Sequence, residues 1–386
     1  MTKQELEKRL IEIRRHLHQH PELSKEEFET TKSITGWLLE KDIEIRQTSL
    51  PTGVFAEIKG GKPGPTIAIR ADIDALPIQE QTGLPFASLA EGKMHACGHD
   101  FHTAALIGAA YLLKEEEEQL TGTVRFLFQP AEESGAGAEK VINDGQLEGV
   151  DAIIGLHNKP DLPVGTVGLK DGPLMAAVDR FKVVVKGVGG HAGLPQKGHD
   201  PIAAAAQLVT ALQTIVSRDT SPLENAVVSV TKITGGNSWN IIPEDVTLEG
   251  TVRTFDSAVR QHVKERFYQI SEYISQAFQV ESAVKWYAGP PPLVNDPVIT
   301  DITRAAARSL RLTVVNPERS TAGEDFSYFL HQIPGSFAFF GTNGAEDWHH
   351  PSFTVDETAL IKAAYYLFNS GKELLKHVQV REGVLG

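Results

Sequence analysis

The chain has 386 residues, of which 41% are hydrophobic, and its formal net charge is -13. This length predicts two or three domains, and the excess of acidic residues argues against a nucleic-acid-binding surface, which needs clustered Lys and Arg. No apolar run is long enough to span a bilayer, and the charged, amphipathic start is unlike a signal segment. We therefore expect a cytoplasmic protein that binds neither nucleic acid nor a membrane.

Helical and strand-like segments alternate along the first part of the chain. Apolar residues recur at helical spacing near the start, the runs "GVFAEIKG" and "TIAIRADID" are typical of strands, and a helix is expected from about Thr103 to Glu118. Two further short apolar runs, "TVRFLFQ" and "AIIGLH", follow. Such alternation predicts a mostly parallel sheet covered by helices.

The pattern changes after Gly172. A strand "RFKVVVKG", a helix over residues 200–217, two successive strands, a helix over residues 256–278 and a strand "VESAVKWYAG" follow in that order. The order β-α-β-β-α-β is that of the ferredoxin-like unit. The α/β pattern then resumes with helices expected near residues 297–310 and 356–376.

This order predicts an inserted domain. We expect a catalytic α/β domain made of residues 1–180 and 293–386, interrupted by a ferredoxin-like α+β insert of residues 181–292.

The stretch "MHACGHDFHTAA", residues 94–105, contains the only cysteine, Cys97, close to His95, His99 and His102. A single cysteine cannot form an internal disulfide, so Cys97 is either a small buried side chain or part of a reactive site. From this stretch alone, a metal site, a nucleophile and a chance grouping all stay open.

Carboxylates and imidazoles follow several of the predicted strands. They are Asp72 and Asp74, Glu132 and Glu133, His157, and His349 with His350. Because the carboxyl ends of parallel strands meet at one edge of a sheet, we expect these groups to share a crevice with the Cys97 loop. A thiolate, imidazoles and a carboxylate are what a transition metal requires, and the i, i+2 spacing of Cys97 and His99 lets one loop supply two ligands.

Ordered motifs along nearly the whole chain carry a family resemblance. They include "RRHLHQHPELSKEE", "RADIDALPIQEQTG", "MHACGHDFHTAA", "FQPAEESGAGA", "GGHAGLPQKGHDP", "AGEDFSYF" and "HHPSF". The sequence resembles the metal-dependent amidohydrolase family of aminoacylases, hippurate hydrolases, N-acetyl-diaminopimelate deacetylase and auxin-conjugate hydrolases. It is especially similar to bacterial N-acetyl-amino-acid deacetylases, some of which act on sulfur-containing amino acids such as N-acetylcysteine.

The resemblance implies a set of metal ligands, which are Cys97, His99, Glu133, His157 and His349. The adjacent His350 is a rival to His349, but it stands where the family has a polar residue after the ligand histidine, so His349 is preferred. The set would hold one or two divalent ions; a thiolate favours zinc or cobalt, whereas the carboxylate and imidazoles also accept manganese or nickel. Asp72 and Asp74 are expected to orient the ligands, because a metal-bound imidazole commonly donates its other N–H to a carboxylate.

The resemblance also implies roles in catalysis and substrate binding. Glu132 would be the general base for water attacking a linear amide. His191, in the insert, would hold the oxyanion, often from a partner subunit, so the insert would act as a lid and a dimerisation domain of a homodimer. Because the substrate carries a free carboxylate, Asn240 and Arg253 are the donors proposed for it.

Three alternatives remain open from the residues. A cysteine hydrolase would use Cys97 as nucleophile with His99 or His157 as base, but it would leave adjacent Glu132 and Glu133 without a role. A non-catalytic metal-binding protein would need no general base. A dipeptidase of the same architecture would take a substrate with a free α-amino group.

Overall fold

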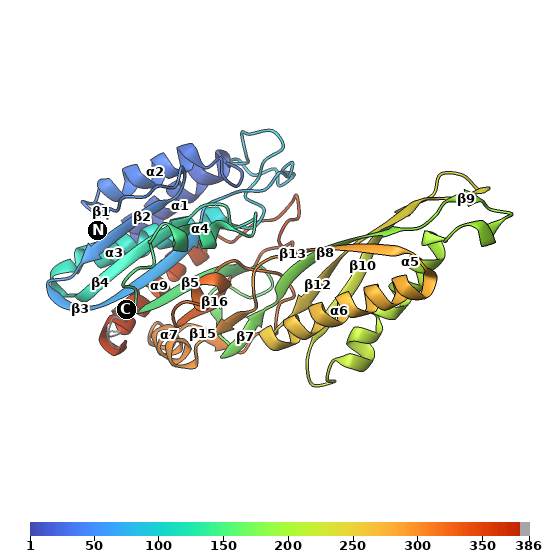
Figure 1. Ribbon diagram of the computed structural model, residues 1–386. Coiled ribbons are helices and arrows are strands. Elements are labelled where there is room, and N and C mark those ends of the chain that lie inside the picture. Colours follow the sequence, from blue (N-terminus) through green and yellow to red (C-terminus); the bar gives the residue numbers. More distant parts are fainter. Residues whose placement is uncertain (379–386) are drawn as a thin grey trace. The chain divides into compact units, whose positions relative to one another are not determined.

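The computed structural model describes residues 1–378, and the chain divides into two compact units (Figure 1). The first unit contains residues 1–172, residues 294–318 and the chain from Asp325 onward. The second unit contains residues 173–293 and 319–324. None of the helices in the described part of the chain is long and apolar enough to cross a membrane.

The first unit is built on an eight-stranded sheet. Its strands, in spatial order, are β1 (Glu44–Ile45), β2 (Val54–Lys59), β4 (Thr121–Gln129), β3 (Lys62–Asp72), β5 (Ala152–Lys159), β16 (Gly335–Gly341), β6 (Thr166–Gly168) and β15 (Thr313–Val315). Strands β4, β3, β5 and β16 are parallel neighbours, whereas β1–β2, β2–β4 and β16–β6 pair antiparallel. The expected α/β class with a mostly parallel central sheet is confirmed.

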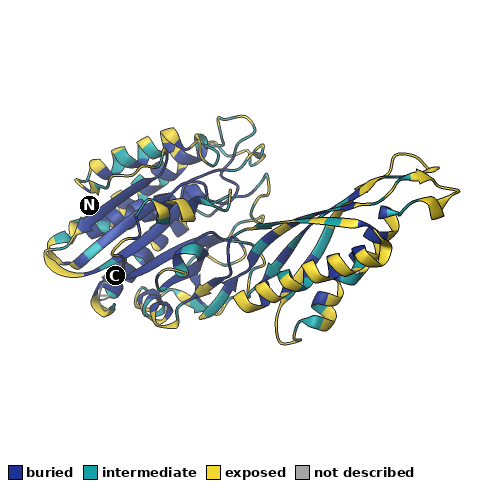
Figure 2. Ribbon diagram, viewed as in Figure 1, coloured by how far each residue is buried: buried dark blue, intermediate teal, exposed yellow. Residues whose placement is uncertain are grey.

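Helices cover this sheet. They are α1 (Lys3–Gln19), α2 (Phe28–Leu39), α3 (His99–Glu115), α4 (Gly137–Asn143), α7 (Pro297–Ser309), α8 (Ser327–Leu330) and α9 (Thr358–His377). Helices α3 and α9 pack on each other and on β3, and α1 packs on both. The strands between them are buried (Figure 2), because helices and neighbouring strands remove their apolar side chains from water.

The second unit has the predicted β-α-β-β-α-β order. Its elements are β8 (Ala177–Lys186), α5 (Pro201–Leu212), β10 (Ala226–Gly235), β12 (Asp245–Thr254), α6 (Ser257–Phe278) and β13 (Glu281–Ala288). The strands form an antiparallel sheet in the order β10-β12-β8-β13. Apolar side chains on the sheet and on α5 and α6, among them Phe181, Leu208 and Phe267, form a core of their own.

Helix ends differ from the prediction in two places. Helix α3 begins at His99 rather than near Thr103, because Gly98 takes a left-handed conformation and serves as its N-cap. Helix α5 ends at Leu212, and a π-helical turn over Ile215–Asp219 follows it. The predicted caps Asp200 and Asp256 accept hydrogen bonds from the first turns of α5 and α6.

Short strands complete the chain. A small ladder joins β9 (Gly190–His191) to β11 (Ile241–Ile242), and β7 (Gly172–Met175) and β14 (Leu293–Asn295) lie where the chain passes from one unit to the other.

Candidate metal centre

Four parallel strands of the first unit end at the same edge of the sheet. Asp72 is the last residue of β3, Glu132 and Glu133 follow β4, His157 lies near the end of β5, and His349 is in the loop after β16. Because these strands are neighbours, their ends bring the side chains together as the strand-end rule expects.

Gly98 explains how Cys97 and His99 reach the site together. Its φ is +82°, and a Cβ on it would lie 2.4 Å from Nδ2 of Asn158. That amide donates to the backbone oxygen of Cys97 at 2.6 Å. Only glycine accommodates both the left-handed backbone and the close amide, so the tight turn sets Cys97 and His99 at the N-terminus of α3.

Three of the overlapping groups of donor atoms at this edge contain the candidate ligands. The first joins Cys97, His99 and His157, the second Cys97, Glu133 and His349, and the third His99, Glu132 and Glu133; within each group the donor atoms lie within 4.8 Å of one another. The sulfur of Cys97 is 3.4 Å from Nε2 of His157, and Nε2 of His349 is 3.5 Å from Oε1 of Glu133. The first two groups share Cys97.

Two of these donor atoms have no hydrogen-bond partner among residues 1–378. They are Nε2 of His99 and Oε1 of Glu133, and both are buried. They lie 3.9 Å apart, too far for a hydrogen bond. Buried polar atoms normally have partners, and these two point into a set of thiol, imidazole and carboxylate groups, which fits a divalent transition metal.

Asp74 positions two of the candidate ligands through hydrogen bonds. Its Oδ1 accepts from Nδ1 of His99 at 3.2 Å, and its Oδ2 accepts from the hydroxyl of Ser24 at 2.6 Å and from the backbone N–H of Glu133 at 3.0 Å. A carboxylate on Nδ1 fixes the tautomer of His99 and leaves Nε2 free to bind a metal.

The electrostatics reflect several buried charges in one place. Burial disfavours a charged His99, but Asp72, Asp74 and Glu133 outweigh it and raise the pKa of His99 to about 10. Burial, together with the Glu133, Glu132 and Asp72 carboxylates, raises the pKa of the Cys97 thiol well above its usual range. Thus Cys97 stays protonated at neutral pH until a cation replaces its proton.

His102 does not supply a metal ligand. Its Nδ1 donates to Oδ1 of Asp72 at 2.6 Å, and its Nε2 accepts the backbone N–H of Asn158 at 2.9 Å. Both ring nitrogens are therefore used, which assigns His102 a structural role. His95 is buried as well, its ring nitrogens have no hydrogen-bond partner in the described chain, and burial lowers its pKa to about 4.

The two candidate histidines after β16 differ in what they face. His349 has a positive φ of 66°, and its backbone N–H donates to the oxygen of Ala96 at 2.9 Å, which aims the ring at Glu133. His350 instead accepts from the backbone N–H of Ser352 at 3.1 Å and lies 3.9 Å from Glu346. This geometry favours His349 as the ligand.

Glu132 lies beside the donor cluster without being buried in it. The preceding Ala131 has a positive φ of 60°, a conformation that bends the chain sharply after β4. Oε1 of Glu132 accepts the backbone N–H of Asp325 at 3.3 Å. Glu133 thus faces the other donor atoms, whereas Glu132 is held next to them.

Three residues at the site were missed by the sequence reasoning. Trp348 packs on His157 with ring centroids 4.6 Å apart and donates to the oxygen of Asn158 at 3.2 Å, so it walls one side of the cluster. Arg70 and Asp325 are fully buried, and Arg70 donates to Asp72 at the end of β3. A charged residue inside the apolar strand "TIAIRAD" was the available signal for Arg70.

The remaining predicted residues belong to the second unit. His191 and Asn240 are exposed neighbours: His191 pairs with Ile241, and the backbone N–H of Ala192 donates to the oxygen of Asn240 at 3.1 Å. Arg253 lies near the other end of β12, opposite Val178, and its buried Nη1 has no hydrogen-bond partner within residues 1–378.

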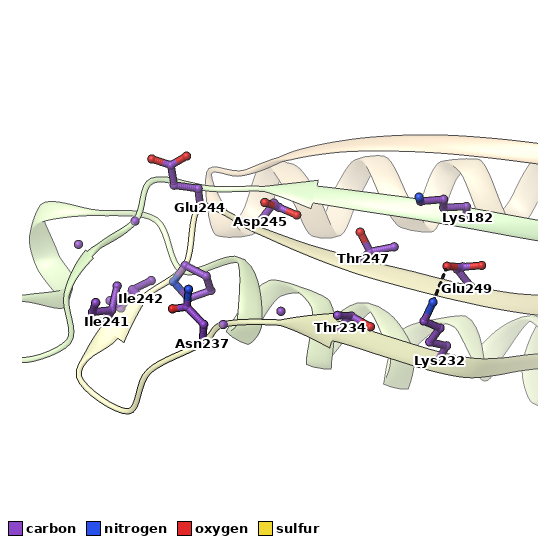
Figure 3. Close-up of a pocket in the computed structure, with 15 residues that line it drawn as sticks. Lys182, Lys232, Thr234, Asn237, Ile241, Ile242, Glu244, Asp245, Thr247 and Glu249 are labelled. Carbon is purple, nitrogen blue, oxygen red and sulfur yellow. Dashed lines mark hydrogen bonds and ion pairs between the residues drawn. The ribbon is translucent and has the colours of Figure 1, made fainter.

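A hollow of about 720 Å³ lies beside the β9–β11 ladder (Figure 3). Ile241, Ile242 and Asn237 line one end, and the paired Lys232 and Glu249 line the other, at a distance of 3.2 Å. It contains no histidine or cysteine, so its side chains do not resemble those of the donor cluster.

Comparisons with known proteins agree with this architecture. The sequence model of Peptidase family M20/M25/M40 matches residues 68–370. The chain is 66% identical, over 96% of its length and 89% of the relative's, to an N-acetyl-L-cysteine deacetylase of Bacillus subtilis. It is 40% identical, over 92% of its length and 93% of the relative's, to thermostable carboxypeptidase 1 of Saccharolobus solfataricus. The crystal structure of a dinuclear metal-binding M20 peptidase from Bacillus subtilis has a TM-score of 0.88 and 51% identity, covering 97% of this chain and 99% of that one.

Proposed function

Because this chain belongs to peptidase family M20/M25/M40, as the resemblance of its motifs predicted, we propose that it is a metal-dependent amidohydrolase that deacylates N-acyl L-amino acids. The observation that carries the proposal is the cluster of Cys97, His99, Glu133, His157 and His349 with Glu132 beside it. The preferred substrates are N-acetyl amino acids, those with sulfur-containing side chains first, in line with the deacetylase relative.

The five ligands are proposed to hold two ions. Two donor groups that share Cys97 support this number, since a thiolate can serve both. A divalent metal held there would supply positive charge that lowers the pKa of water to roughly 7 and polarises an amide carbonyl. The donor set accepts zinc, cobalt, manganese or nickel.

Glu132 would do the proton transfers. Its carboxylate takes a proton from the water that attacks the carbonyl carbon, and it later gives that proton to the nitrogen as the C–N bond breaks. The products are a carboxylate and a free amino acid. Its hydrogen bond from the backbone N–H of Asp325, at 3.3 Å, holds Oε1 of this carboxylate in place.

The substrate carboxylate needs donors, and Arg253 and Asn240 are proposed for it. The unpaired Nη1 of Arg253 supports this role, because a buried guanidinium nitrogen without a partner is costly. Arg253→Ala should raise KM for N-acetyl amino acids much more than for the corresponding amides, and equal effects on both would remove Arg253 from this role.

His191 is proposed to hold the oxyanion of the tetrahedral intermediate, from the partner subunit of a homodimer formed through the second unit. Its exposure on β9 supports a contact outside its own unit. His191→Ala should lower kcat by about 100- to 1000-fold with metal content unchanged. Mixed dimers of Glu132→Gln and His191→Ala subunits should regain activity; no recovery, despite subunit exchange, would exclude action in trans.

A substrate panel tests the function directly. The purified protein is loaded with Zn²⁺ or Mn²⁺ and assayed for amine release from N-acetylcysteine, N-acetylmethionine, other N-acyl amino acids and dipeptides. We expect turnover of the N-acetyl substrates, and Glu132→Gln should keep the metal and lose most of this turnover, because an amide cannot accept the proton. Failure to hydrolyse any N-acyl amino acid would refute the proposal.

The structure and the relatives support one alternative, peptide hydrolysis, and argue against another, a cysteine nucleophile. Peptide hydrolysis is a second candidate, supported by the 40% identity to a carboxypeptidase, and the dipeptides in the panel test it. A cysteine nucleophile is disfavoured, because the raised pKa of Cys97 leaves almost no thiolate at neutral pH. A cytoplasmic location remains a prediction.

A further inference from the structure

Arg70 is a fully buried arginine in the middle of the first unit. It lies on β3 two residues before Asp72, and its side chain is 0% exposed. Its Nε donates to Oε1 of Gln129 at 2.8 Å, Nη1 donates to Oδ2 of Asp72 at 2.6 Å, and Nη2 donates to Oδ1 of Asp325 at 2.9 Å. A guanidinium in such a place would be very costly without these partners.

One end of this arrangement reaches the ligand histidines. Asp72, held by Arg70, accepts from Nδ1 of His102 and lies 3.7 Å from Nε2 of His99. His102 in turn accepts from the backbone N–H of Asn158, the neighbour of His157. Arg70 therefore fixes the carboxylate that lies against the imidazoles of His99 and His102.

The other end reaches the general base. Asp325 accepts from Arg70, from Nε2 of Gln129 at 2.8 Å and from the backbone N–H of Ala138 at 2.9 Å, so its position is fixed from three sides. The backbone N–H of the same residue donates to Glu132. A shift of Asp325 would therefore move the donor that holds Glu132.

We propose that Arg70 is a positioning residue, which through Asp72 and Asp325 fixes the ligand histidines and the general base relative to each other. The proposal rests on the roles given above to His99, His157 and Glu132. Its geometric basis is the rigid fork of the guanidinium, whose three N–H directions meet three fixed oxygens; an ammonium group has no such fork.

Arg70→Lys tests this role because it keeps the charge and loses the fork. We expect kcat at saturating Zn²⁺ to fall by about 10- to 100-fold, since displacement of a catalytic group by 1 Å can cost about 100-fold. We also expect Zn²⁺ affinity, measured by competition with a chromogenic chelator, to weaken by about 10-fold or more. KM for N-acetyl amino acids should change little, because the side chain of Arg70 is fully buried and the partners of its hydrogen bonds named above are protein groups.

Arg125→Lys is the matched control. Arg125 is a buried arginine on the neighbouring strand β4, and its Nη1 alone donates to the backbone oxygens of Gln146 and Glu148 at 2.8 and 2.9 Å, away from the cluster. Both variants replace a buried guanidinium by an ammonium group, so both should lose stability, but only Arg70→Lys loses a fork that is paired through three nitrogens. Equal kcat and Zn²⁺ affinity in the two variants, per folded molecule, would overturn the proposal.

Asp325→Asn tests the contact that leads from Arg70 to Glu132 separately from the contact that leads to the histidines. It also replaces Arg70→Lys as the test if that variant does not fold. It keeps the backbone N–H and the size of the side chain but weakens the pairing with Arg70. We expect kcat to fall while Zn²⁺ affinity stays at the wild-type value, and an unchanged kcat would refute the arm that leads to Glu132. If the wild-type protein hydrolyses no N-acyl amino acid, the proposed function fails, whereas the Zn²⁺ affinity of Arg70→Lys still tests the arm that leads to the histidines.

Discussion

Gly98→Ala should damage the metal centre by a mechanism that can be measured. The backbone at Gly98 has a φ of +82°, and the new Cβ would lie 2.4 Å from Nδ2 of Asn158. The left-handed conformation costs an alanine about 1–2 kcal/mol. Because Asn158 is buried and hydrogen bonded to Cys97 and His102, relieving the overlap adds about 1–3 kcal/mol. We therefore expect a total loss of about 2–5 kcal/mol.

Gly92→Ala separates the two contributions. Gly92 also has a positive φ, of 71°, but a Cβ on it would have no atom within 4 Å. It should lose only the conformational part, about 1–2 kcal/mol, and keep the metal centre intact.

Urea unfolding of the metal-free proteins measures both losses, and Zn²⁺ titration measures binding. We expect Gly98→Ala to be the less stable variant and to bind Zn²⁺ more weakly, because Cys97 and His99 flank the substituted residue. Equal stability losses and equal Zn²⁺ affinities for the two variants would refute the close approach of Gly98 and Asn158 as the reason for glycine here.

Two further predictions concern the metal ligands. His349→Ala should lower metal content, measured by atomic absorption, whereas His350→Ala should not, since only His349 faces Glu133; the reverse result would exchange their roles. Metal uptake at pH 7 should release about two protons, from Cys97 and His99, whose pKa values are both raised, so metal affinity should increase with pH. An indicator dye in weakly buffered solution counts these protons, and uptake without proton release would contradict the prediction.

The region of the metal centre could be found in the sequence because its side chains obey a rule of topology, whereas the individual ligands were implied by the family resemblance. Side chains that follow parallel strands meet at one edge, so Glu133, His157 and His349 could be grouped without coordinates. Spacing alone grouped Cys97 with His99, but it could not separate His99 from His102. That distinction depends on the contacts of His102 with Asp72 and Asn158, which come from distant parts of the chain.

Arg70 and Asp325 show where sequence reasoning ended. The segment "RADIDALP" drew attention to its two aspartates, because acids after a strand indicate a site, whereas the arginine at its start signals only a buried charge and does not name its partners. Asp325 is 255 residues away, and only folding brings it within 2.9 Å of Arg70. Tertiary pairing of this kind cannot be derived from local pattern, although a buried charge in an apolar strand predicts that some partner exists.

The positions of Arg253 and Asn240 constrain how many chains form one substrate site. Asn240 lies beside the Asp245 end of β12, and Arg253 is eight residues farther along that strand, so roughly 27 Å separate the two ends. A small N-acetyl amino acid cannot bridge this distance, and hence one copy of the second unit can supply either Arg253 or the Asn240–His191 pair. If both act, two copies contribute. Mixed dimers of Arg253→Ala and His191→Ala subunits would then contain one intact site and regain activity, whereas no recovery after proven exchange would mean that one of the two residues takes no part in the site.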